Sequence, residues 1–208
     1  METAITLGIF FLGVFIPLLL IPIIERKKNN VKREESINEL FVELKDIHSE
    51  LIEHVESNFK LLINIRTNPD LTNQLGIPIP MPKCINIDML GDLYKNSALL
   101  LTSHQRLAIK HIPNRVNEIM RHSQMLADSF NHKGEYCIMS IKNTIKRSSL
   151  QIHEINFLLE HKKRFIPNKG LDSNIATLLV LKSLGFSDDQ IKISKIEESF
   201  FNGLKIEI

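Results

Sequence analysis

The first 25 residues form the most apolar stretch of the chain. Between Ala4 and Ile24 there is no charged side chain, and 15 of the 21 positions are Ile, Leu, Phe or Val. A helix rises about 1.5 Å per residue, so this stretch would reach roughly 31 Å, the thickness of a bilayer's hydrocarbon core. The pattern predicts an N-terminal single transmembrane helix, and we assign residues 1–25 to this anchor.

Positive charge on one side of the apolar run gives the anchor a direction. Five cations follow it within eight residues, whereas no Lys or Arg precedes it; they are Arg26, Lys27, Lys28, Lys32 and Arg33, here called the basic collar. Lys and Arg mark the cytoplasmic side of a span and are attracted to anionic lipid headgroups at the membrane surface. We therefore expect an inner (plasma) membrane protein with its N-terminus outside and its C-terminal domain cytoplasmic.

The apolar run has two other interpretations. A cleavable signal peptide carries positive charge before its apolar core and small residues at its cleavage site. Here Glu2 precedes the run and no A-x-A pattern follows it. A buried core helix is the other alternative, because long apolar stretches also occur inside globular domains. The one-sided collar and the length of the run favour the uncleaved anchor.

A helical pattern of a different kind follows the collar. The stretch from about Lys32 to Arg66 contains no Gly or Pro. Its apolar residues recur at the three-and-four spacing of a buried helix face: Ile37, Leu40, Phe41, Leu44, Leu51, Val55, Phe59 and Leu62. We assign residues 26–67 to the basic collar and a long juxtamembrane amphipathic helix that forms part of a bundle.

Six carboxylates advance along the same helix by three or four residues. They are Glu35, Glu39, Glu43, Asp46, Glu50 and Glu53, here called the acidic ridge. An offset of two residues from the apolar stripe, or about 200°, would place the ridge on the opposite face. We predict a possible docking ridge for a basic protein partner, while a solvated face of a bundle helix is the more ordinary interpretation. The negative inner leaflet would repel this ridge.

The remaining chain divides into a Pro-rich loop, residues 68–84, and residues 85–208, which complete the bundle. Helical patterns run over about 87–112, 116–130 and 135–165. Pro113 either begins a new helix in its first turn or kinks one long helix. The pattern over 135–165 has the seam spacing of a coiled coil or bundle.

A helical hairpin is predicted at the C-terminal end of the chain. One helix is expected from about Ser173 to Leu184, and Gly185 follows it. Ser187 with Gln190 three positions later forms a capping box that opens a last helix to about Asn202. The predicted fold is therefore all-α, an N-terminal single transmembrane helix followed by a cytosolic helical bundle of about five to six helices.

Composition narrows the functional classes. The formal net charge is only +2, so we expect no nucleic acid partner. Cys84 and Cys137 lie far apart without C-x-x-C spacing, as in proteins of a reducing compartment. The chain has no Trp and is rich in Ile, Leu, Asn and Lys, which resembles proteins of AT-rich bacterial genomes.

Motifs for catalysis are missing from the sequence. No His has a Glu three positions before it, and His153-Glu154 does not continue as His-Glu-x-x-His. Glu118 and His122 have the i,i+4 spacing of two metal ligands, one fewer than the three of a catalytic zinc. Neither a G-x-S-x-G elbow nor a phosphate-binding Gly-rich loop is present. We expect no catalytic, cofactor-binding or metal-binding residues.

These patterns favour a single-pass membrane-anchored helical protein that acts by protein-protein contact, as a scaffold, sensor or regulator. Its partners would be membrane lipid, through the N-terminal helix, and a protein partner or a second copy of the chain. The alternative is a membrane-perturbing, toxin-like effector controlled by its cytosolic helical domain. An anchored hydrolase is a third hypothesis, which requires distant residues to converge in one cleft.

Overall fold

The structure is a computed structural model of the chain. It describes the backbone of residues 2–68, 84–133, 137–167 and 171–197, and their side chains except for 2–17, 19 and 129–133. These residues contain six α-helices, one short 3-10 helix and no strand, which confirms the predicted all-α bundle. The elements are α1 (Glu2–Thr67), α2 (Leu90–Ser97), α3 (Ser103–Lys133), α4 (Ile138–His161), η2 (Lys162–Arg164), α5 (Ser173–Ser183) and α6 (Asp188–Ser194).

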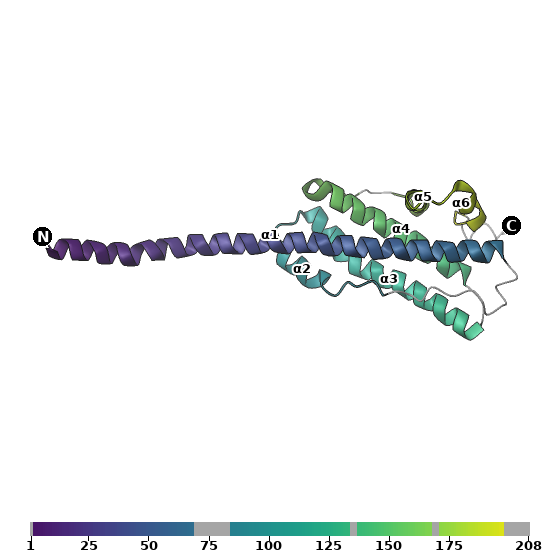
Figure 1. Ribbon diagram of the computed structural model, residues 1–208, viewed down its shortest axis with the longest axis horizontal. Coiled ribbons are helices and arrows are strands. Elements are labelled where there is room, and N and C mark those ends of the chain that lie inside the picture. The colour runs from purple at the N-terminus through teal and green to yellow at the C-terminus, as the bar shows by residue number, and fades with distance from the viewer. Residues whose placement is uncertain (1, 69–83, 134–136, 168–170, 198–208) are drawn as a thin grey trace, which may run out of the picture.

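Helix α1 runs through the bundle and projects far beyond it towards its N-terminus (Figure 1). Its described side chains are exposed up to Glu35, and Leu40 is the first buried one. Most side chains of the predicted anchor, Ala4–Ile24, lie outside the described residues. Within the part of the chain that the structure describes, no helix combines the length and the apolar character needed to cross a bilayer.

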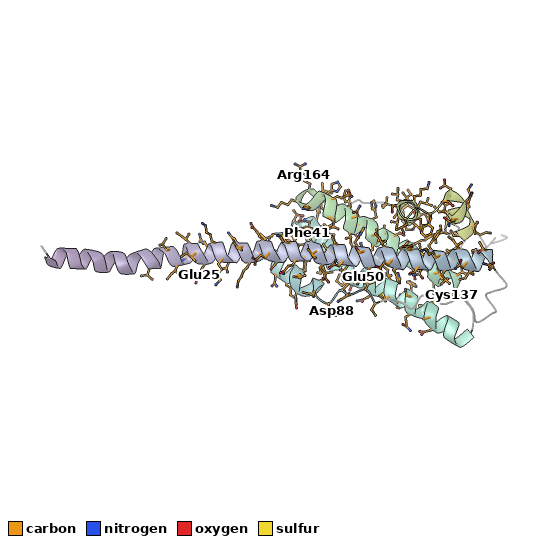
Figure 2. All side chains as sticks on the ribbon, viewed as in Figure 1. Glu25, Phe41, Glu50, Asp88, Cys137 and Arg164 are labelled. Carbon is orange, nitrogen blue, oxygen red and sulfur yellow. The ribbon has the colours of Figure 1, made fainter. Side chains whose placement is uncertain are left out.

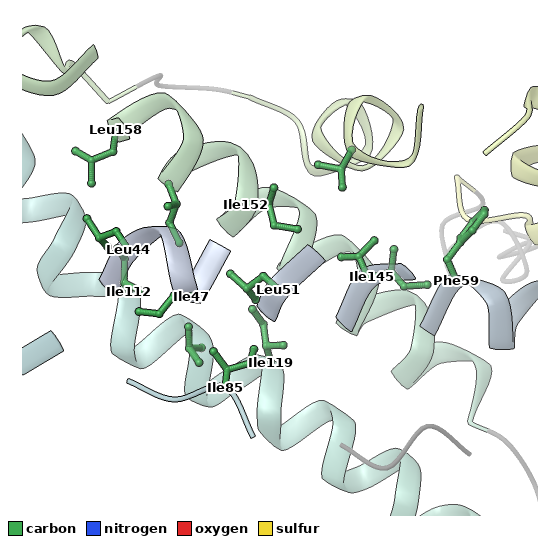
Figure 3. Close-up of a cluster of buried hydrophobic side chains, with 14 of the residues drawn as sticks. Leu44, Ile47, Leu51, Phe59, Ile85, Ile112, Ile119, Ile145, Ile152 and Leu158 are labelled. Atoms are coloured by element: carbon green, nitrogen blue, oxygen red, sulfur yellow. The ribbon is translucent and has the colours of Figure 1, made fainter. Parts of the chain in front are cut away.

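The core lies between the inner half of α1, residues 36–67, and the helices around it. α1 packs against α4, α2 and α6, while α4 also packs against α3 and α5. Leu44, Leu51 and Phe59 of α1 are fully buried and point into this core (Figure 3). Their spacing of seven or eight residues returns each side chain to the same face after two helical turns. The apolar stripe of the sequence is thus the inner face of α1.

One break in the helices differs from the sequence prediction. The pattern over 87–112 was expected to be continuous, but α2 ends at Ser97 and α3 begins at Ser103. Thr102 caps α3 with a reciprocal pair of hydrogen bonds. Its backbone N–H donates to Gln105 Oε1 at 2.8 Å, and the Gln105 N–H donates to Thr102 Oγ1 at 3.2 Å. This capping box satisfies donors that a new helix start would otherwise leave unpaired.

Pro113 begins no new helix, because α3 continues through it to Lys133. The predicted seam of α4 is buried, with Ile141, Ile145 and Ile155 at 0 % exposure. α3 and α4 therefore give the bundle two long helices packed against each other and, through α4, against α1.

The C-terminal hairpin has the predicted caps. Ser187 and Gln190 form a capping box at the start of α6, and Gly185 adopts φ 83° in the turn after α5. The last helix is shorter than predicted, because Lys195 adopts the left-handed conformation directly after Ser194 and ends α6 there. Residues 69–83, nearly all of the Pro-rich loop, and 198–208 lie outside the described residues.

Candidate functional site

The acidic ridge lies beside the core, not opposite to it. Glu43 and Glu50 are half-buried, whereas Asp46 and Glu53 are exposed. Successive helix residues are about 100° apart, so Glu43 lies only about 100° from the fully buried Leu44. The prediction that the ridge lies opposite the core is wrong for this part of the ridge. Leu44 and Leu51, which directly follow the half-buried Glu43 and Glu50, are fully buried.

A short segment before α2 crosses the ridge and converts it into a groove. The backbone N–H of Asn86 donates to Glu50 Oε2 at 2.9 Å, and the N–H of Asp88 donates to Asn86 Oδ1 at 3.0 Å. Glu50 and Asp88 lie on the side of α1 where α2 packs (Figure 2). The resulting acidic groove has a volume of about 400 Å³ and is lined by Glu43, Asp46, Ser49, Glu50, Glu53 and Asn86.

Negative charge is concentrated in the acidic groove. The pKa of Glu43 is raised above its ordinary value of 4.5, first by burial and then by repulsion from Asp46, Glu50 and Asp88. A carboxylate whose charged form is disfavoured in this way gains from the approach of a cation. The groove can therefore hold Lys or Arg side chains, whose ammonium and guanidinium groups bind carboxylate oxygens through charge-assisted hydrogen bonds.

The other predicted surface, the basic collar, occupies the projecting half of α1. All five of its residues, Arg26 to Arg33, are exposed. The collar and the acidic groove follow each other along one continuous helix, so the positive charges of the collar precede the negative charges of the groove along α1. Glu35 and Glu39, the first two residues of the ridge, are exposed and lie outside the groove.

Among the histidines whose side chains the structure describes, His54 has the largest pKa shift, and it is buried where α1, α3 and α4 meet. His54 Nε2 lies 2.9 Å from Ser123 Oγ, and Nδ1 lies 3.5 Å from Ser148 Oγ. Burial lowers the pKa of His54 to about 4, so its ring is neutral near pH 7. This polar cluster is sealed in the core with the His54 side chain only 5 % exposed. It ties three helices together and offers no access to a substrate.

Glu118 and His122, the predicted i,i+4 pair, do not form a ligand pair in the bundle. Glu118 accepts a hydrogen bond from Arg147 of α4 instead, and Arg115 forms an ion pair with Glu154. No group of three or more His, Cys, Asp or Glu side chains among the described residues could hold a metal ion.

A smaller cavity of about 190 Å³ separates α4 from the segment that follows it. It is lined by Arg115, Leu150, His153, Glu154, Phe157, Phe165, Pro167 and Leu171. Its walls are mainly apolar, and its two charged side chains are paired with each other. Since both charges are compensated, this cavity attracts ions less strongly than the acidic groove does.

The acidic groove could not be located from the sequence alone. Its carboxylates were identified as a ridge, but the wall that contains Asn86 comes from a segment 36 residues further along the chain. Comparison of the chain with known protein families, curated proteins and solved structures finds no match. The site's own geometry is therefore the basis of the functional argument.

Proposed function

We propose that this chain is a single-pass membrane protein whose cytoplasmic helical bundle recruits a basic protein partner through the acidic groove. The observation that carries the proposal is the groove itself, in which half-buried and exposed carboxylates surround one volume of about 400 Å³. The raised pKa of Glu43 supports it, because that shift comes from burial and from neighbouring negative charge. A cationic side chain in the groove would offset the repulsion among these carboxylates and part of the free-energy cost of burying Glu43.

The arrangement of the carboxylates favours a peptide-like partner. Glu43, Asp46 and Glu50 follow α1 at a rise of about 5 Å per turn, so successive carboxylates can meet successive Lys or Arg residues of one segment. Ser49 and Asn86 add neutral hydrogen-bonding groups between the charges. Half-buried charges are screened less by solvent than open surface charges, so ion pairs with the half-buried Glu43 and Glu50 would contribute more to affinity and specificity than ion pairs with the exposed Asp46.

The sequence supports the membrane part of the proposal. The apolar run Ala4–Ile24 has the length of a span, and the basic collar follows it on one side. α1 is one helix from Glu2 to Thr67, so an anchor at its start would fix the direction in which the groove faces. Resistance of the full chain to alkaline carbonate extraction tests the anchor, and protease protection in sealed vesicles tests its orientation.

Binding of a Lys/Arg-rich peptide to the full chain in lipid nanodiscs tests the groove. Glu43→Gln/Asp46→Asn removes two carboxylates from it and should weaken binding by about tenfold. Asp189→Asn/Glu197→Gln is the matched control, because it removes the same charge from exposed positions outside the groove. Equal weakening by both variants, or by neither, would count against a specific groove.

A further inference from the structure

A second charged surface lies at the end of the bundle from which the projecting half of α1 emerges. It consists of residues 98–107, which contain the turn between α2 and α3, and residues 161–167, which contain η2. We call this surface the basal tip. Its two segments contain four Lys or Arg residues, Arg106, Lys162, Lys163 and Arg164, and no Asp or Glu.

Hydrogen bonds hold the two segments of the basal tip together. Gln105 Nε2 donates to the Lys162 carbonyl at 3.0 Å, which joins the start of α3 to η2. The Arg106 guanidinium donates to the carbonyls of Ala98 at 3.2 Å and Leu101 at 3.0 Å, which fixes the α2–α3 turn. Arg164 lies at the same end of the bundle as Phe41, where α1 leaves it (Figure 2).

Large apolar side chains are exposed among these cations. Leu99 is 77 % exposed, Ile166 is 65 % exposed and Leu107 is 54 % exposed. Lys162, Lys163 and Arg164 are all exposed as well, and they directly follow α4, which ends where Lys162 adopts φ 42°. Exposed apolar side chains beside cations are typical of surfaces that enter the headgroup region of an anionic bilayer.

We infer that the basal tip binds the anionic inner leaflet, with Ile166 facing the lipid headgroups and Lys162, Lys163 and Arg164 beside the phosphates. This inference rests on the proposed membrane anchor, because the anchor brings the tip to the bilayer. Each Lys or Arg near an anionic leaflet strengthens attachment by about fivefold, so three such cations make a large contribution. The bundle would then lean on the membrane instead of standing upright above it.

Contact between the basal tip and the membrane requires α1 to tilt, because the projecting half of α1 is long. From Ile24 to Leu40 a helix spans about 24 Å, so an upright α1 would hold the tip beyond the headgroups and their roughly 8 Å screening length. Transmembrane helices tilt by up to about 40°, and α4 stands about 10 Å from α1, so tilting towards α4 brings the α4 side of the tip to about 12 Å from the hydrocarbon core, where extended Lys and Arg side chains reach the phosphates. Figure 1 shows α4 and α2 on opposite sides of α1, so this tilt turns the acidic groove away from the lipid.

The experiment uses the full chain in nanodiscs of phosphatidylcholine, with or without a third of phosphatidylglycerol. Cys84→Ser/Cys137→Ser removes both native thiols, and an environment-sensitive fluorophore is attached through Ile166→Cys or, as a control, Met125→Cys. Met125 is 52 % exposed on the distal part of α3. A headgroup spin-labelled lipid should quench the probe at position 166 about threefold more than at position 125, only in the anionic discs.

Charge variants separate contact with the membrane from other causes of quenching. Lys162→Gln/Lys163→Gln/Arg164→Gln should abolish the difference between the two probes. Lys45→Gln/Lys60→Gln/Lys192→Gln removes the same charge from exposed positions outside the tip and should leave the difference intact. Equal quenching at both positions, or quenching that is the same in neutral discs, overturns the inference. Quenching that falls as the number of chains per disc rises also overturns the inference, because it would indicate that a second copy of the chain covers the tip.

Failure of the anchor is distinguished by a separate measurement. Chains that alkaline carbonate removes from vesicles lack the proposed span, and the tip is then tested by co-sedimentation of the full chain with the same two vesicle compositions. Binding that requires phosphatidylglycerol and is lost in the tip variant supports the basal tip even without a span. Binding that is indifferent to lipid charge and to the tip variant overturns it.

Discussion

The two halves of α1 share one backbone and differ in what covers their side chains. In the inner half, residues 36–67, a buried residue recurs every three or four positions, and Leu40, Leu51 and Phe59 are fully buried. In the projecting half the described side chains are exposed, among them Val31 at 54 %. Isolated helices in water are marginal, and most helical stability in proteins comes from packing. The bundle therefore supports only the inner half, while the projecting half depends on the proposed membrane and collar contacts.

The sharpest test of this difference is one truncation in each half. Leu51→Ala removes a fully buried side chain and should lower the free energy of unfolding of the bundle by about 2 to 5 kcal/mol. Val31→Ala removes an exposed one and should change it by less than about 0.5 kcal/mol. Urea denaturation followed by circular dichroism measures both. Similar losses in the two variants would show that the halves are not energetically distinct.

Acid should destabilise the inner half, since residues 2–35 contain no histidine. Burial lowers the pKa of His54 from 6.5 to about 4, so its contribution to stability is fully present above pH 6.5 and is lost as the pH falls towards 4. The loss should reach about 3 kcal/mol at the acid end of this range. Denaturation at several pH values measures it.

His54→Gln is the variant that isolates this effect, because glutamine keeps hydrogen-bonding groups near Ser123 without titrating. It should remove most of the pH dependence between 6.5 and 4. His48→Gln is the control, since burial lowers the pKa of His48 too, but that side chain is only half-buried and contacts the core less closely. A pH profile that His54→Gln leaves unchanged would assign the acid loss to other groups.

A smaller effect is expected at the turn that closes the bundle where the two halves of α1 meet. Thr102→Ala removes the side-chain acceptor of the capping box at the start of α3 and should cost about 1 kcal/mol. Thr102→Ser keeps the hydroxyl and should cost less. Thermal unfolding of both variants measures the difference. Equal melting temperatures would show that the Thr102 side-chain cap does not stabilise the bundle.

The smallest effect concerns two glutamates of the acidic ridge. The pKa of Glu43 is raised, so the stability linked to this group is present below its ordinary pKa of 4.5 and is lost as the pH rises through the raised value. Glu43→Gln should therefore raise the melting temperature slightly near pH 7. Glu35→Gln, in the exposed projecting half, should leave it unchanged. A decrease in the Glu43 variant would mean that its charge stabilises the bundle.

Local signals in the sequence predicted much of the fold. The apolar stripe of α1, the seam of α4 and the Ser187–Gln190 capping box all depend on residues within a few turns of one another. The break before α3 had a similar signal, a Thr with Gln three positions later, but the surrounding apolar pattern concealed it. For Pro113, periodicity on both sides allowed two outcomes, and packing of α3 against α4 accompanies the continuous one.

The candidate site could be predicted only in part, because its walls come from distant segments. The carboxylates of the ridge were visible as a pattern, but the pairing of Glu50 with Asn86 required the chain to turn back along α1. Likewise, nothing local indicates that His54 meets Ser123 and Ser148, which lie on two other helices. The half-buried position of Glu43 decides its pKa, and that position depends on the phase of the core stripe relative to the ridge.

A nitroxide scan along α1 of the full chain in nanodiscs tests whether α1 is one helix that starts in the membrane and ends in the bundle. Single labels are placed from residue 4 to residue 65, and collision with oxygen and with a water-soluble relaxation reagent is measured. We expect labels over 4–24 to collide with oxygen and not with the water-soluble reagent, and labels over 26–35 to collide with that reagent. From Leu40 onwards, every third or fourth label should be protected from both. Water-accessible labels throughout 4–24 in chains bound to the nanodisc would contradict it.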